Sequence, residues 1–181
     1  MNILSLKNNI SKLAVLSGFI FFTSMTLSAQ APNAATAKLA AEPTYTAENP
    51  GWLVNLDEAY AKSKATGKPI MANFTGSDWC GWCKKLTANV FVHDAFKKWA
   101  EQNVILLEID APRRKYIPES VKSQNAGLQQ AFQVQGYPTV WVFNMDKDPK
   151  TNQYTIEALG KTGYTATVEE FTTGVEQMIK K

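Results

Sequence analysis

Cys80 and Cys83 are the only cysteines of this 181-residue chain, and two residues separate them. They lie in the stretch TGSDWCGWCKKL, with Trp79 before the first cysteine and Trp82 between the two. A pair at this spacing is compatible with three kinds of site: half of a zinc site, a structural disulfide, or a redox-active dithiol.

Zinc and a structural disulfide both fit the composition poorly. A structural zinc ion needs about four ligands, and besides its one cysteine pair the chain offers a single histidine, His93, and carboxylates. We interpret His93 as a solvated or helix-capping residue. A structural disulfide is possible, but it would close too short a loop to add much stability. The domain is also large enough to fold around one core without a covalent link. Redox chemistry fits best.

The position of Cys80 supports that choice, because a strand is expected to give way to a helix there. PIMANFTG (69–76) is mostly apolar and ends in a glycine, as a buried strand does. The start of a helix has unpaired N–H groups and the positive end of the macrodipole, and both stabilise a thiolate over a thiol. Cys83 follows one turn later on the same face. We therefore expect Cys80 to be the nucleophile and Cys83 the resolving thiol.

The hydrophobic pattern of the remaining chain predicts an α/β fold. Strands are expected at 69–76, 104–110, 139–144 and 154–160, and helices at 55–66, 83–103 (restarting near Asp94), 127–134 and 167–181. Residues 111–127 read as an inserted loop, either a solvated connector or a partner-specific feature. Helices between the first three strands imply crossover connections, and the tight turn before the last strand implies an antiparallel hairpin. The prediction is an α/β sandwich around a mixed central sheet.

The N-terminal residues have the order of a secretory signal peptide, which we assign to 1–29. Lys7 and Lys12 precede an apolar run that is shorter than a membrane span, and small residues follow, with cleavage after Ala29 or Ala31. Residues 30–50 are expected to form a flexible tether, because they contain few large apolar side chains. The folded domain is then 51–181.

The charge of the expected mature chain is nearly neutral. Removing Lys7 and Lys12 lowers the formal net charge from +3 to +1. This composition gives no electrostatic reason to expect binding to nucleic acid or to an anionic membrane. We expect a monomer with a periplasmic or otherwise exported location.

The motif WCGWCK after an apolar strand, with GYPT (136–139) some fifty residues later, resembles the thioredoxin superfamily. The closest resemblance is to exported bacterial thioredoxin-like proteins, and it covers about 55–181. It implies a three-layer sandwich with a central mixed β-sheet flanked by helices. It further implies that Pro138, after Tyr137, is a cis proline facing the disulfide, and that the backbone there pairs with substrate.

The same resemblance implies that Trp79, Gly81 and Trp82 belong to the substrate-binding surface with Tyr137 and Pro138. Trp82 lies where side chains of this fold tend to be exposed, although both tryptophans could instead serve core packing. The lysines after Cys83, Lys84 and Lys85, either lower the pKa of a sulfur or point to solvent. No metal is expected.

One position departs from the family pattern. Cytoplasmic thioredoxins have an aspartate beneath the active site that helps to move protons, and the aligned residue here is Asn73. An amide is not a general base at ordinary pH. The remaining candidates are Asp78, Glu108, Asp110, Lys84 or a water molecule, with Asp78 more readily interpreted as an exposed capping or solubilising residue.

The two residues between the cysteines tune the direction of electron flow in the family. Gly81 and Trp82 include no histidine that would stabilise a thiolate, so we expect a moderately reducing pair. The expected function is reduction of disulfides in exported proteins. A membrane electron-donor thiol protein would keep the pair reduced, and no cofactor beyond the Cys80–Cys83 disulfide is expected. The alternatives are a disulfide isomerase or oxidant, and a non-catalytic binding module.

Overall fold

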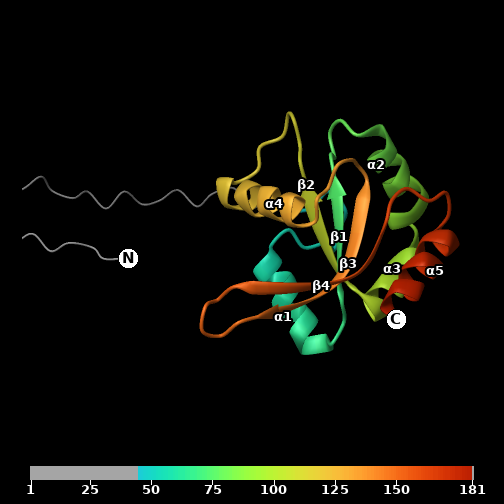
Figure 1. Cartoon of the computed structure of the whole chain (residues 1–181). Coiled ribbons are helices and arrows are strands. Elements are labelled where there is room, and N and C mark those ends of the chain that lie inside the picture. Colours follow the sequence, from blue (N-terminus) through green and yellow to red (C-terminus); the bar gives the residue numbers. More distant parts are fainter. Residues whose placement is uncertain (1–44, 181) are drawn as a thin grey trace, which may run out of the picture. The chain divides into compact units, whose positions relative to one another are not determined.

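A four-stranded mixed sheet forms the centre of the protein (Figure 1). The computed structural model describes residues 45–180, so the expected signal peptide and most of the expected tether lie outside the described residues. The strand order is β2-β1-β3-β4; β1 pairs with β2 in parallel, and the other two pairings are antiparallel. The strands are β1 (Ile70–Thr75), β2 (Ile105–Asp110), β3 (Thr139–Lys147) and β4 (Tyr154–Thr162).

Helices cover both faces of this sheet and complete the expected three-layer sandwich. They are α1 (Leu56–Thr66), α2 (Gly81–Leu86), the π-helical turn η1 (Thr87–Phe91), α3 (Asp94–Asn103), α4 (Glu119–Ala131) and α5 (Val168–Ile179). Within residues 45–180, no helix combines the length and apolar character needed to cross a lipid bilayer.

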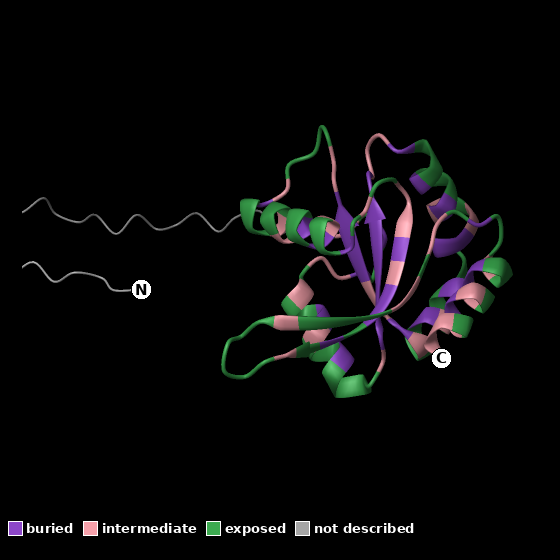
Figure 2. Cartoon of the chain, viewed as in Figure 1, coloured by how far each residue is buried: buried purple, intermediate pink, exposed green. Residues whose placement is uncertain are grey.

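Alternation along β1 separates the core into two clusters. Every residue of β1 is buried, as Figure 2 shows for the centre of the sheet. Met71 faces a cluster that includes Leu86 of α2 and Phe171 of α5. Phe74 faces the opposite cluster, which includes Leu128 of α4. A strand with both faces buried has a nearly continuous run of apolar residues. This run is why the strand could be predicted from the sequence.

Most predicted element ends agree with the structure, because the local signals are strong. Asn55 caps α1 by accepting a hydrogen bond from the Glu58 N–H, and Gly67 ends that helix with a φ of 70°. The helix after the cysteines does restart at Asp94, with the π-helical turn before it.

The prediction for residues 111–127 was wrong in its second half. The helix α4 begins at Glu119, not at Gly127. Its buried face includes the polar residue Asn125, whose Nδ2 donates to the Asp110 carbonyl at 2.9 Å. A polar residue on the buried face interrupts the apolar periodicity that would have revealed this helix.

The last residues of the expected tether pack against the folded domain. Ala47 lies against one core cluster, and Asn49 is buried. Leu53 then forms an isolated parallel bridge with Leu107 of β2. The packed part of the chain therefore begins before Gly51.

The turn between β1 and α2 is shaped by the contact of Trp79 with Gly76. The N–H groups of Trp79 and Cys80 both donate to the Gly76 carbonyl, at 3.1 and 2.8 Å. A Cβ atom at Gly76 would lie 2.4 Å from Cε2 of the Trp79 ring. This turn therefore accepts only a residue without a side chain, since a glycine leaves room for the indole.

We predict that Gly76→Ala destabilises the protein by about 1–3 kcal/mol, the usual cost of forcing an extra group into a packed site. The measurement is urea unfolding. Gly127→Ala is the matched control: it lies in the exposed interior of α4 with nothing within 4 Å of the added Cβ. That control should be stabilising by about 0.5–1 kcal/mol, because alanine is favoured within a helix. Equal stability of the two variants would contradict the prediction.

Candidate functional site

The two cysteines form a disulfide at the start of α2. Cys80 is the N-cap of this helix, and the Cys83 N–H donates to Cys80 Sγ at 3.1 Å. The two residues are 6% and 4% exposed, so only a small part of the pair reaches solvent. The strand-to-helix position predicted for Cys80 is confirmed. The Cys80 sulfur therefore lies beside the N–H groups at the start of α2, which stabilise a thiolate.

Trp79 connects the cysteine motif to two other loops. Its Nε1 donates to the Ala111 carbonyl at 2.8 Å, and its ring meets the Tyr137 ring edge-on at 5.5 Å. The Tyr137–Pro138 peptide bond is cis, as the resemblance implied. Tyr137 is held in turn by a hydrogen bond from its hydroxyl to Gln129 at 3.0 Å. The structure thus brings the cis-proline loop against the residue that precedes Cys80.

Trp82 is an exposed aromatic beside the disulfide, with 55% of its surface accessible. Its ring meets the Tyr164 ring edge-on at 4.9 Å, and Asn89 donates to the Tyr164 hydroxyl at 3.0 Å. Tyr164 was not predicted as a site residue, because it lies in the β4–α5 loop with no recognisable motif in the neighbouring sequence. Gly81, between Cys80 and Trp82, is also exposed. Trp82 and Tyr164 form an aromatic surface next to the cysteines.

Asp78 anchors the β2–α4 loop to the cysteine motif, in agreement with its interpretation as a capping residue, and it is partly exposed. Its carboxylate accepts hydrogen bonds from the backbone N–H groups of Arg113 (3.0 Å) and Arg114 (2.6 Å). Partial desolvation raises the pKa of the Asp78 carboxyl, but these hydrogen bonds together outweigh it and lower the pKa. Its role is to cap a neighbouring loop, which makes it a poor proton acceptor.

Glu108 is a buried carboxyl group on the neighbouring strand. It is 1% exposed and pairs in register with Asn73. Its oxygens accept from the Glu48 N–H at 2.8 Å and from Asn49 Nδ2 at 3.0 Å. Burial raises the pKa of Glu108, and the hydrogen bonds from Glu48 and Asn49 oppose that rise without cancelling it.

A cavity of about 390 Å³ is lined by both Glu108 and Cys83. Its remaining lining residues are Glu48, Asn49, Thr75, Ser77, Lys84, Thr87, Ala88 and Val92. Space of this size accommodates water molecules that could link the carboxyl group to the sulfur. Asn73, at the family's proton-transfer position, is 2% exposed, and its Oδ1 has no hydrogen-bond partner in residues 45–180.

Asp110 has a different environment from Glu108. It accepts hydrogen bonds from the Ser77 N–H at 2.9 Å and the Ser77 hydroxyl at 2.6 Å. Burial raises the pKa of Asp110, while the bonds from Ser77 oppose the rise. Asp110 lines a separate hollow with the β2–α4 loop, and Cys83 is not among the residues of that hollow. Glu108 shares a cavity with Cys83, whereas Asp110 lines the hollow beside the β2–α4 loop.

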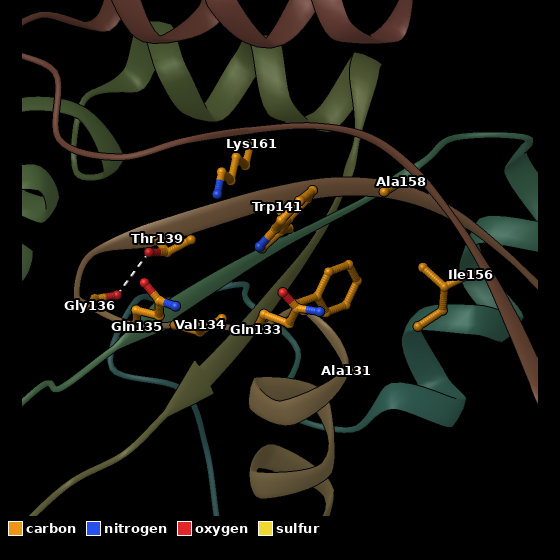
Figure 3. A pocket seen from close by; sticks show the side chains of 11 residues that line it. Ala131, Gln133, Val134, Gln135, Gly136, Thr139, Trp141, Ile156, Ala158 and Lys161 are labelled. Carbon is orange, nitrogen blue, oxygen red and sulfur yellow. Dashed lines mark hydrogen bonds between the residues drawn. The ribbon is translucent and has the colours of Figure 1, made fainter.

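A larger hollow of about 610 Å³ is lined by Gly136 and Thr139, which lie on either side of Tyr137 and Pro138 in the sequence (Figure 3). It lies between the segment 131–136 and strands β3 and β4, and Lys161 and Trp141 point into it in Figure 3. The Thr139 hydroxyl donates to the Gly136 carbonyl at its edge, at 2.8 Å. Its lining includes no cysteine, histidine or carboxyl group, so thiol or acid–base chemistry belongs to the cysteine site instead.

Comparison with known proteins agrees with this arrangement. Residues 56–155 match the family described as a thioredoxin-like domain. The chain is 37% identical over 81 residues to Disulfide bond reductase DsbH of Chlamydia pneumoniae, covering 45% of this chain and 49% of that protein. It is 29% identical over 87 residues to Thioredoxin-related protein DsbJ of the same organism, covering 48% and 25%. The chain thus spans half or less of the length of these two relatives.

Solved structures show the same fold. A DsbH oxidoreductase superposes with a TM-score of 0.61 at 26% identity, over 76% of this chain and 92% of that one. A thioredoxin from Thermus thermophilus superposes with a TM-score of 0.50 at 20% identity, over 68% of this chain and 83% of that one. Because the matched domain covers more than half of its residues, this chain belongs to the thioredoxin-like family.

Proposed function

We propose that this protein is an exported thiol–disulfide oxidoreductase that reduces disulfides in other exported proteins. The observation that carries the proposal is the Cys80–Cys83 disulfide at the start of α2, beside the cis-proline loop. Exposed Trp82 next to the pair supplies a surface for a substrate chain. The signal-peptide pattern of residues 1–29 supports export.

The proposed reaction is thiol–disulfide exchange in two steps. The Cys80 thiolate bonds to one substrate sulfur, the substrate S–S bond breaks, and the other substrate sulfur leaves and takes up a proton. The Cys83 thiol then loses its proton and attacks Cys80 Sγ. This attack re-forms the Cys80–Cys83 disulfide and releases the first substrate sulfur, so the substrate gains two electrons and two protons.

Glu108 is the group best placed to receive the Cys83 proton, through water in the cavity that both residues line. The Glu48 N–H, the Asn49 N–H and Asn49 Nδ2 donate to its carboxylate and stabilise the ionised form. Burial raises its pKa, which makes the ionised carboxylate a stronger base at neutral pH. Asn73 has no such capacity because it is an amide.

The direction of electron flow is proposed from two observations. A strongly oxidising pair is one whose reduced form is stabilised, and a histidine between the cysteines would stabilise the thiolate of that form. The dipeptide Gly81-Trp82 contains no histidine, so the reduced form is favoured less than in a strong oxidant. One relative, DsbH of Chlamydia pneumoniae, is named a disulfide bond reductase. We propose a moderately reducing pair that a membrane thiol protein re-reduces. A measured potential near −120 mV, the value of the strongest oxidants, would instead support an oxidant.

We predict that the protein accelerates insulin reduction by dithiothreitol, followed as turbidity, and that Cys80→Ser abolishes the acceleration because the nucleophile is lost. Cys83→Ser should retain the first step and accumulate a mixed disulfide with substrate, detectable on a non-reducing gel. No acceleration by the wild type would support the non-catalytic binding module. Repair of scrambled disulfides that exceeds net reduction would support the isomerase.

We predict that Glu108→Gln slows single-turnover reduction of a peptide disulfide on the order of 100-fold at neutral pH, because a general base is removed. The deficit should shrink as pH rises, since hydroxide then deprotonates Cys83 directly. Glu169→Gln, an exposed charge change on α5, is the control and should leave the rate unchanged. A deficit that is constant across pH would assign Glu108 a structural role only.

Comparison of the wild type with Glu108→Gln also tests the raised pKa of Glu108. A native pKa above the unfolded value means that the native state holds the proton more tightly, so stability falls as pH rises between the two values. Relative to Glu108→Gln, the wild type should therefore lose free energy of unfolding as pH rises above about 4.5, the ordinary value of this group. Urea unfolding at a series of pH values measures this difference. A difference that is independent of pH would contradict the raised pKa.

A further inference from the structure

Cations stack on both tryptophans that flank the nucleophile. Lys85 Nζ lies 4.3 Å from the centre of the Trp82 ring, and Arg113 Cζ lies 4.1 Å from the centre of the Trp79 ring. Cation–π contacts at this distance are attractive and restrict where the charged groups can lie. One positive charge is thus held on each of the two tryptophans that lie next to the cysteines in the sequence.

Two further cations meet at the backbone of Asp78, two residues before Cys80. Lys84 Nζ and Arg114 Nη2 donate to the same Asp78 carbonyl, at 3.3 and 3.2 Å. The Asp78 carboxylate is occupied by backbone N–H groups of the β2–α4 loop. We call Lys84, Lys85, Arg113 and Arg114 the cationic rim. All four residues are exposed.

The cationic rim is not neutralised by close ion pairs. Within residues 45–180, none of its four side chains has a carboxylate oxygen within 4.0 Å, whereas the neighbouring Lys115 pairs with Glu48. The expected mature chain carries a formal charge of only +1. These four cations, set against the one Asp78 carboxylate that interacts with Arg114, leave a local excess of positive charge next to the cysteine motif, although the chain as a whole is nearly neutral.

We infer that the cationic rim selects substrates whose disulfide is flanked by acidic residues. This inference rests on the proposed function and names its substrate class. Carboxylates beside the substrate cysteine would approach Lys85 and Arg113 as the substrate sulfur approaches Cys80. Complementary charge accelerates encounter and disfavours partners of the opposite sign. The rim residues lie on segments next to the cysteines: Lys84 and Lys85 follow Cys83, and Arg113 stacks on Trp79, which precedes Cys80. The nearly neutral chain gives no electrostatic reason to expect nucleic acid or a membrane as the partner.

The test compares two synthetic peptides that share one intramolecular disulfide and differ only in the residues beside it, glutamate in one and lysine in the other. The measured quantity is kcat/KM for their reduction by the full mature protein. We expect at least about a tenfold preference for the acidic peptide at low ionic strength, within the range of electrostatic steering. The preference should fall as salt is raised, because charges are screened beyond about 10 Å at 0.1 M salt.

Variants identify the rim as the source of the preference. Arg113→Gln with Arg114→Gln should lower kcat/KM for the acidic peptide and raise it for the basic one. The lysine variant, Arg113→Lys with Arg114→Lys, should restore the preference. Both double variants keep the backbone N–H groups that donate to the Asp78 carboxylate. The control is Lys98→Gln with Lys150→Gln, which removes the same charge from exposed positions outside the rim and should leave the preference unchanged.

Three outcomes would overturn the inference while leaving the proposed function intact. The first is equal reduction of the two peptides by a protein that reduces insulin. The second is a preference that survives both high salt and the double glutamine variant. The third is retention of anionic vesicles or of single-stranded DNA by the wild type but not by the glutamine variant, which would show a general anion site. Failure to reduce any disulfide, insulin included, would instead count against the proposed function itself.

Discussion

The contact between Trp79 and Gly76 is the constraint on which the arrangement of the site depends. Because residue 76 has no side chain, the indole lies directly over the end of β1. From there it reaches the Ala111 carbonyl, the Tyr137 ring and the Arg113 guanidinium. One side chain thus fixes the β2–α4 loop and the cis-proline loop relative to Cys80. Catalysis by exchange needs such fixed positions, since the attacking sulfur and its target must align.

The second constraint is the location of the buried carboxyl group. The family's usual position is an amide here, Asn73, and the acid lies opposite it on the adjacent strand, at Glu108. A carboxyl group this deeply buried is costly to ionise unless donors surround it. The donors come from Glu48 and Asn49, before the first helix. The basicity of the group is therefore set by a balance between burial and hydrogen bonds from another part of the chain.

The local features of the site were predictable, and the contacts between distant segments were not. The cysteine pair at a helix start, the buried strand β1 and the cap at Asn55 are each encoded by adjacent residues. Tyr164 and the first turns of α4 were missed because their surroundings are set by tertiary packing. Nothing in a single sequence distinguishes Glu108 from Asp110. Their difference arises because one side chain lines a cavity with Cys83 and the other binds Ser77.

The packing of residues 45–50 also bears on where a working fragment of this protein can begin. The family match starts at residue 56, and a fragment cut there would keep all four strands and both cysteines. It would lack the backbone and amide donors that hold Glu108. Such a fragment would keep the fold of the family, but water would replace the missing donors at the Glu108 carboxyl group, in the cavity that it shares with Cys83. The structural unit that holds Glu108 is therefore longer at its amino end than the recognisable domain.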